Sequence, residues 1–177
     1  MKKRINNRMI VAFAVAAAFS VFTVQAQDKA ECQQALANFK NVDPTIQGIL
    51  DSAAGYAVFP NVGKGGFIIG GARGKGLVFE KGKVTGQATM TQASIGAQAG
   101  GQSFAELIVF EDTTALNNFK SSNFEMSAGV SAVAIRQGAS QAAKYDHGVA
   151  VFTMAKKGLM AEAAVGGQKF KFQPTSQ

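Results

Sequence analysis

Residue types that often carry chemistry are scarce in this chain of 177 residues, which has no tryptophan, two tyrosines, one histidine and one cysteine. Cys32 is the single cysteine and cannot form a disulfide within the chain. We expect it to be a small, buried, apolar residue on a helix. One histidine and one cysteine cannot make a soft zinc site. We therefore expect neither a metal nor a cofactor. The lack of tryptophan and the low tyrosine content also argue against nucleic acid as a partner.

Glycine, by contrast, is abundant, and nine of the twenty glycines lie in the stretch Gly63–Gly86. Their spacing matches neither of the common phosphate-binding fingerprints. A P-loop requires Ser or Thr after Gly-Lys, whereas Gly74 and Lys75 are followed by Gly76. We interpret most of these glycines as tight turns, because glycine accepts positive φ without steric cost. A backbone nest that binds phosphate is the alternative.

Nucleophilic catalysis has little support in the sequence. Ser94 and Ser127 each lack one glycine of the G-x-S-x-G elbow. A serine–histidine pair would need His147, whose place before Gly148 is typical of a turn. We expect Asp146 to point away from this histidine if the segment is a strand. The sequence therefore predicts a protein that is not an enzyme.

The first 26 residues have the pattern of an export signal. Basic residues come first, an apolar run over residues 9–24 follows, and small residues precede a cleavage point after Ala26. An uncleaved membrane anchor is the alternative, but a spanning helix needs about 20 apolar residues and this run is shorter. We expect an exported protein, periplasmic or extracellular and peripheral to a membrane, with residues 27–177 forming a single domain.

Positive charge is concentrated in one part of the chain. The formal net charge of +7 falls to +3 without the four basic residues of residues 1–26, and the stretch Gly63–Gly86 alone carries +4. Local positive charge favours an anionic partner such as lipid head groups. The stretch contains a single acid, Glu80, and five basic residues: Lys64, Arg73, Lys75, Lys81 and Lys83.

Hydrophobic periodicity predicts two N-terminal helices followed by many short strands. Residues 28–42 place apolar side chains at helical spacing, and Asp43 with Pro44 could start a second helix that ends at Gly55. A further helix is predicted over residues 112–120, capped by Asp112 or Thr113. The expected fold class is α+β, with the two helices packed on a strongly curved, largely antiparallel, Gly/Ala-rich and barrel-like sheet. We prefer this packing to helices that lie on a membrane, because their polar faces carry few basic residues.

Four strand predictions can be checked individually. Pro60 should end the first strand, because proline lacks the ladder donor. Lys81-Gly82-Lys83 should be a hairpin turn. Glu106 interrupts an apolar strand and should point to solvent at an edge. The last three strands should form a meander, and the predicted strands are residues 56–59, 66–69, 76–79, 84–94, 103–110, 124–135, 148–154, 158–165 and 168–172.

Several ordered motifs together resemble the SYLF domain, also called the Ysc84-type domain. The first is Ala-Gly-Tyr-Ala-Val-Phe-Pro at residues 54–60, followed by Lys-Gly-Gly at 64–66 and Gly-Gly-Ala-Arg-Gly-Lys-Gly at 70–76. The similarity continues over residues 94–102 and 157–167. The resemblance implies a lipid-binding module: eukaryotic members bind phosphoinositides and some bind actin, whereas bacterial members are exported.

Charge and resemblance together favour a non-enzymatic module of the bacterial cell envelope that binds anionic phospholipid through cationic Gly-rich turns. The expected lipid-binding residues are the five basic residues above and Phe67. Phe79 or the helix face with Leu36 and Phe39 are other candidates for insertion into a bilayer. The alternatives are a structural or partner-binding envelope protein and a carrier of one apolar ligand inside the barrel.

Overall fold

The computed structural model describes residues 27–63, 71–93, 103–121, 123–127, 129–156 and 165–175. The predicted signal segment 1–26 and the predicted strand 66–69 lie outside them, as does nearly all of the predicted strand 158–165. Residues 27–42 are helical, as predicted. The other elements are α2 (Ile46–Ser52), β1 (Gly55–Gly63), β2 (Gly71–Glu80), β3 (Lys83–Ala93), β4 (Phe104–Phe110), α3 (Thr113–Lys120), β5 (Phe124–Glu125), β6 (Ala132–Ala134), the 3₁₀ helix η1 (Ala139–Ala142), β7 (Val149–Ala155) and β8 (Lys169–Pro174).

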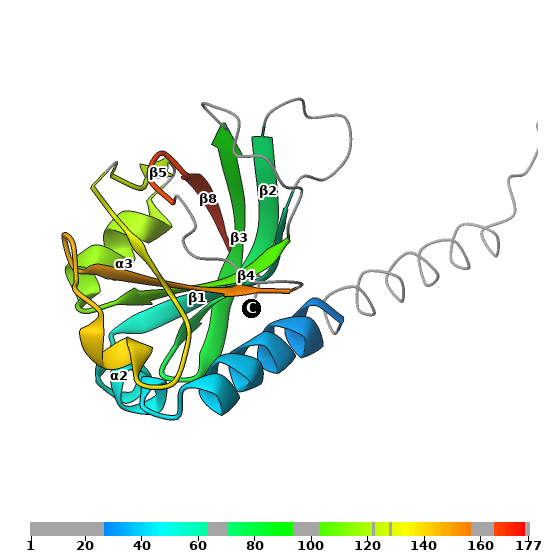
Figure 1. The fold of residues 1–177 in the computed structure, drawn as a ribbon. Helices are drawn as coiled ribbons and strands as arrows, with labels where there is room; N and C mark the ends of the chain where they lie inside the picture. The colour runs from blue at the N-terminus through cyan, green and yellow to red at the C-terminus, as the bar shows by residue number, and fades with distance from the viewer. Residues whose placement is uncertain are drawn as a thin grey trace, which may run out of the picture.

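The strands form one eight-stranded sheet in the order β5-β8-β3-β2-β1-β4-β7-β6. Every neighbouring pair is antiparallel except β6 and β7, which are parallel. The sheet curls strongly (Figure 1). The predicted α+β class, the curved and largely antiparallel sheet and the inserted helix α3 are confirmed.

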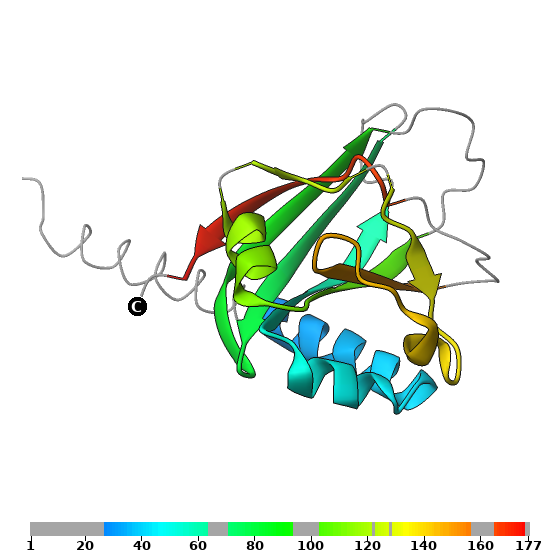
Figure 2. The same ribbon diagram turned by 90° about the vertical axis from the view of Figure 1, so that its left-hand side faces the viewer.

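The two N-terminal helices cover part of the outer face of the sheet, and α3 lies on the inner face (Figure 2). Cys32, Leu36 and Phe39 of the first helix are buried against outward-facing side chains such as Leu107 and Phe152. The prediction that these helices cover a sheet is therefore confirmed. Leu36 and Phe39 are part of this core, so their prediction as membrane-inserting residues is wrong.

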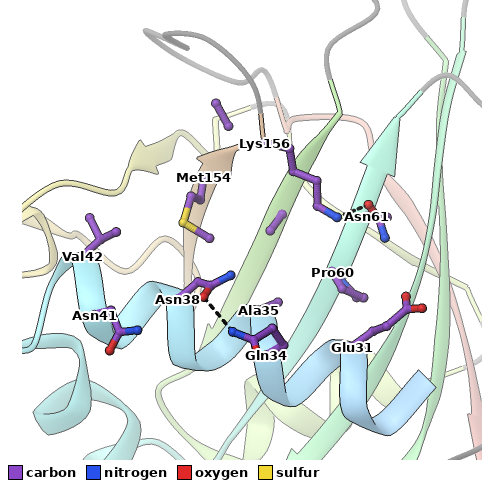
Figure 3. Close-up of a pocket in the computed structure, with 12 residues that line it drawn as sticks. Glu31, Gln34, Ala35, Asn38, Asn41, Val42, Pro60, Asn61, Met154 and Lys156 are labelled. Carbon is purple, nitrogen blue, oxygen red and sulfur yellow. Dashed lines mark hydrogen bonds between the residues drawn. The ribbon is translucent and has the colours of Figure 1, made fainter. Parts of the chain in front are cut away.

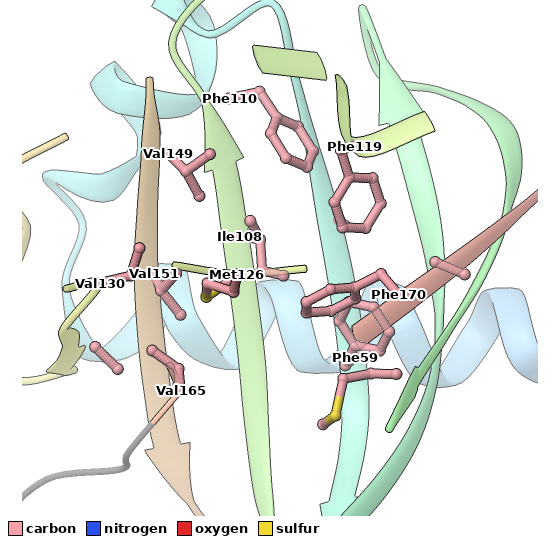
Figure 4. Packing of buried hydrophobic residues seen from close by; sticks show 14 of the residues in the cluster. Phe59, Ile108, Phe110, Phe119, Met126, Val130, Val149, Val151, Val165 and Phe170 are labelled. Atoms are coloured by element: carbon pink, nitrogen blue, oxygen red, sulfur yellow. The ribbon is translucent and has the colours of Figure 1, made fainter. Parts of the chain in front are cut away.

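Phenylalanine rings fill the inner face of the sheet (Figure 4). Phe119 of α3 packs between Phe110 and Phe170, with ring centroids 4.8 Å and 5.1 Å away. Glycines on the strands make room for such rings: a Cβ on Gly86 would lie 2.3 Å from the Phe172 ring. The glycine at position 86 therefore makes room for an aromatic ring within the sheet.

Local signals in the sequence place two elements correctly. Lys81 and Gly82 form the turn between β2 and β3 with φ of 48° and 74°, as a tight hairpin requires. The carboxylate of Asp112 caps α3 by accepting a hydrogen bond of 2.8 Å from the backbone N–H of Ala115. Both predictions are confirmed.

Strand β1 does not end at proline, contrary to the prediction. It continues through Pro60 to Gly63, and its register with both β2 and β4 shifts beside the proline, between Val58 and Val62. Proline is tolerated at such an irregularity because the ladder is already interrupted there.

The prediction that Glu106 points to solvent at an edge is wrong. Strand β4 lies between β1 and β7, and Glu106 is fully buried on the inner face beside Phe59 and Thr153 of the neighbouring strands. Gln168, also fully buried, donates a hydrogen bond of 2.9 Å from its side-chain nitrogen to the Glu106 carboxylate. Burial raises the pKa of Glu106 to about 7, an effect that this hydrogen bond partly offsets.

The middle strand of the predicted C-terminal meander lies almost entirely outside the described residues, and its two outer strands, β7 and β8, are far apart in the sheet. Strand β8 pairs with β3 and β5, not with β7, and places the last residues of the chain beside a strand far earlier in the sequence. Within residues 124–135 only the two short strands β5 and β6 form.

Asp43 is not the cap of the second helix, which begins at Ile46. Its buried carboxylate accepts hydrogen bonds from the backbone N–H groups of Thr45 (3.1 Å) and Ser140 (2.8 Å) and from the Thr45 hydroxyl (2.6 Å). Burial raises the pKa of Asp43, but these hydrogen bonds outweigh it and hold the pKa well below its usual range. Asp43 thus links the segment between the first helix and α2 to η1 through hydrogen bonds.

Candidate functional site

The part of the outer face that the helices leave uncovered is polar and basic. Arg73 and Lys75 alternate with buried Gly74 and Gly76 along β2, so both long side chains leave the sheet on its outer side. Their neighbours on β3 are Thr91 and Thr89. Both basic residues are exposed, and neither makes an ion pair within the described part of the chain. The structure thus places two of the predicted lipid-binding residues side by side.

Two lysines that the sequence did not single out join this surface. Lys169 and Lys171 on β8 pair with Thr91 and Thr89 of β3 and are exposed, whereas Phe170 between them is buried. Lys169 lies 3.5 Å from the carboxylate of Glu125. The alternating Lys-Phe-Lys-Phe of residues 169–172 is the signal that could have placed both lysines on an exposed face. We call the exposed residues Arg73, Lys75, Lys169 and Lys171 the basic face.

The other predicted residues are not on this face. Lys81 and Lys83 lie at the hairpin turn, about 25 Å along the strands from Arg73 at roughly 3.3 Å per residue. Lys64 and Phe67 lie outside the described residues. Phe79 stacks on the Tyr56 ring beneath the helices with a centroid distance of 5.1 Å and is buried, so its proposed insertion into a bilayer is wrong.

A cleft of about 540 Å³ separates the first helix from strands β2, β3 and β8. Asp28 and Glu31 form its helix wall, and Arg73 and Lys75 its strand wall. Glu31 accepts a hydrogen bond of 3.3 Å from Gln27, but no ion pair joins the two walls in the described part of the chain. Opposite charges therefore face each other across an open space.

Cys32 also lines this cleft, where it is buried and donates its thiol to the carbonyl oxygen of Val58 at 3.4 Å. Burial raises the pKa of the thiol to about 12, and the nearby carboxylates of Asp28 and Glu31 add to the effect. Since the thiolate is the reactive form, Cys32 is chemically inert at neutral pH and acts as part of the core, as predicted.

A second groove, of about 710 Å³, runs along the opposite side of the first helix (Figure 3). Its helix wall carries carboxamides, and Gln34 donates a hydrogen bond of 3.0 Å to Asn38. On the sheet side Lys156 donates to the carboxamide of Asn61. Glu31 and Lys156 are its charged lining residues. This groove lacks the cationic cluster of the basic face.

Ser127, Asp146 and His147 are arranged unsuitably for hydrolysis, and Ser94 lies outside the described residues. Asp146 lies between Ser127 and His147: its carboxylate is 3.4 Å from the serine hydroxyl and 2.7 Å from the imidazole. A triad requires the imidazole between the other two, so that it can remove the hydroxyl proton. His147, with φ of 51°, is an exposed turn residue as predicted, and because the segment is a turn rather than a strand, the Asp146 carboxylate lies against the imidazole.

Among the described residues there is no group of three or more His, Cys, Asp or Glu side chains placed to hold a metal ion. None of the helices in that part of the chain combines the length and the apolar character needed to cross a membrane.

The comparisons with known proteins agree with the resemblance drawn from the motifs. Residues 91–175 match the model of the family Ysc84, described as "Las17-binding protein actin regulator". Residues 91–175 therefore belong to the Ysc84 family. Beta cell expansion factor A of Aeromonas veronii is 31% identical over 139 residues, which make up 77% of this chain and 52% of that protein. This chain thus spans about half the length of the curated relative that it matches.

The Ysc84 segment contains β4, β7 and β8, with most of the inner core and two of the four basic-face residues. Ysc84 is a family of binding domains rather than of enzymes, which agrees with the expected class of function. The basic face has the charge for an anionic partner.

Proposed function

We propose that this chain is a non-enzymatic lipid-binding module of the bacterial cell envelope, exported and peripheral to the membrane. It binds anionic phospholipid through the basic face rather than through the hairpin turn at Lys81 and Lys83. The observation that carries this proposal is that Arg73, Lys75, Lys169 and Lys171 lie on one exposed face of three adjacent strands. The Ysc84 family and the lipid binding that it implies support it.

The strength of this interaction follows from the number of charges. Each basic residue near an anionic surface contributes about 1 kcal/mol, so four contribute about 4 kcal/mol, which corresponds to roughly millimolar affinity. Glu125 reduces the share of Lys169. Phe67, which we retain as the inserted side chain, would add about 1.5–3 kcal/mol and bring the affinity to tens of micromolar.

Vesicle co-sedimentation of residues 27–177 with phosphatidylglycerol and phosphatidylcholine vesicles tests the proposal. Replacing Arg73 and Lys75 by Glu removes about 2 kcal/mol of attraction and adds repulsion, so binding should weaken at least about 30-fold. The same charge change at Lys81 and Lys83 is the matched control and should weaken binding much less. Equal losses in both variants would contradict the basic face, and no binding of the wild type to phosphatidylglycerol would contradict the function.

A protein partner is the second candidate, because the description of the Ysc84 family is that of a protein that binds another protein. An exported protein would not meet actin, so its partner would be another envelope protein. In a pull-down from envelope extract, such a partner would appear as a band with the wild type and not with the Arg73→Glu/Lys75→Glu variant. This result, together with a wild type that fails to bind vesicles, would favour the protein partner.

A further inference from the structure

The cleft beside the basic face has a charge pattern that an anionic ligand alone does not explain. A purely anion-binding site would gain from positive charge on every side, yet Asp28 and Glu31 form the wall opposite Arg73 and Lys75. Carboxylates within a site repel a phosphate and attract a cation. The cleft therefore matches a ligand that carries both charges.

The two walls remain separate. Arg73 and Lys75 make no ion pair within the described residues, and the Asp28 carboxylate accepts no hydrogen bond there, so their charges are available to a ligand. The backbone of Gly74 and Gly76 on β2 and the buried Cys32 also line the cleft, whose volume is about 540 Å³. This volume lies within the usual range of small-ligand pockets, about 300–1,000 Å³.

We propose that this cleft binds the phosphoethanolamine head group of a phospholipid. The phosphate lies against Arg73 and Lys75 of the strand wall, and the ammonium group lies against Asp28 and Glu31 of the helix wall. Gln87 and Thr89, which also line the cleft, supply neutral hydrogen-bonding groups between the walls. This inference rests on the proposed function, because the same two cations serve both, and it names the lipid that the site selects.

The chemistry of the head group distinguishes it from other zwitterions. A primary ammonium group donates three N–H hydrogen bonds, which carboxylates accept, whereas the trimethylammonium group of phosphatidylcholine has no donor. The helix wall carries no aromatic side chain for a cation–π contact with a quaternary ammonium group, since its lining residues are Asp28, Glu31 and Cys32. The cleft should therefore favour phosphatidylethanolamine over phosphatidylcholine.

The test uses vesicles with a constant fraction of phosphatidylglycerol, in which the remaining lipid is either phosphatidylethanolamine or phosphatidylcholine. The wild type should bind the first kind on the order of fivefold more tightly, the upper range for one exposed ammonium–carboxylate pair. The Asp28→Asn/Glu31→Gln variant should lose this preference yet bind phosphatidylglycerol at least as well, because it has lost two repelling charges. The Lys81→Gln/Lys83→Gln variant should keep the preference.

The outcomes separate the two proposals. Equal binding to both kinds of vesicle with phosphatidylglycerol binding intact would overturn the head-group site and leave the proposed function standing. A preference that survives in the Asp28→Asn/Glu31→Gln variant would also overturn it. Failure to bind any phosphatidylglycerol vesicle would overturn the function itself. Soluble glycerophosphoethanolamine, titrated by NMR, separates the sources: binding to the free compound without any vesicle preference would overturn the lipid as ligand.

Discussion

The substitution Glu106→Gln tests the account of the sheet most directly. Glu106 is a fully buried carboxyl on the central strand β4, and its described partner is the side chain of Gln168. Its second carboxylate oxygen and the hydroxyl of Thr153 have no hydrogen-bond partner among the residues that the structure describes. Glutamine keeps the shape of the side chain and removes the charge. We therefore expect the variant to be more stable than the wild type at alkaline pH.

The size and the sign of this stability difference follow from the pKa of Glu106. Burial raises the pKa of Glu106 from 4.5 to about 7, so the folded protein binds a proton that the unfolded chain releases. The contribution of the protonated form is fully present below pH 4.5 and is lost as the pH rises through 7. A difference of about 2.5 pKa units corresponds to about 3 kcal/mol. By pH 8 the variant should have gained about that much over the wild type relative to pH 4.5.

Urea denaturation, followed by circular dichroism at several pH values between 4.5 and 8, measures this gain as a difference between the two unfolding free energies. Glu111→Gln is the matched control, because Glu111 is exposed one residue beyond the end of the same strand. Its difference from the wild type should not change with pH. If the Glu106→Gln difference also stays constant across this range, then Glu106 is already ionised in the fold and our view of its surroundings is wrong.

Four other substitutions test separate parts of the fold by the same urea assay. Gly86→Ala should destabilise by about 1–3 kcal/mol, because the new Cβ meets the Phe172 ring, whereas Gly48→Ala on α2 has open space around it and should stabilise by about 0.5–1 kcal/mol. Asp112→Ala should cost about 0.5–2 kcal/mol through loss of the α3 cap, and an unchanged free energy would contradict that role. Asp43→Asn should cost about 2 kcal/mol at pH 7. Because the pKa of Asp43 is lowered, this cost should shrink as the pH falls below about 4, and a constant cost would refute the ionised network.

Local patterns in the sequence were enough to predict the elements whose interactions span a few residues. The helix over residues 27–42, the turn at Lys81 and Gly82 and the cap at Asp112 each depend on neighbours within one turn. The sequence shows a single acid, Glu106, within the apolar strand β4, but it does not show that this acid is buried. Its burial depends on strands β1 and β7 on either side, and no local pattern specifies which strands will be neighbours.

The candidate site shows the same division. The density of charge along the chain identified Arg73 and Lys75, but it grouped them with Lys81 and Lys83. The latter two residues lie at the hairpin turn, at the other end of the strand from Arg73. Adding the lysines of β8 required knowing that β8 pairs with β3 across a long separation in sequence.

By itself, then, the sequence determined the fold class, the family and the presence of a local positive charge, because composition, periodicity and ordered motifs are properties of the chain. The tertiary structure decided which charged residues lie on the same face. Strand order placed Lys171 on the same face as the β2 cations, one strand beyond β3, and the packing of the first helix through Cys32, Leu36 and Phe39 put Asp28 opposite those cations. These choices depend on non-local pairing and burial, since contacts between distant segments are set by the packing of the whole core.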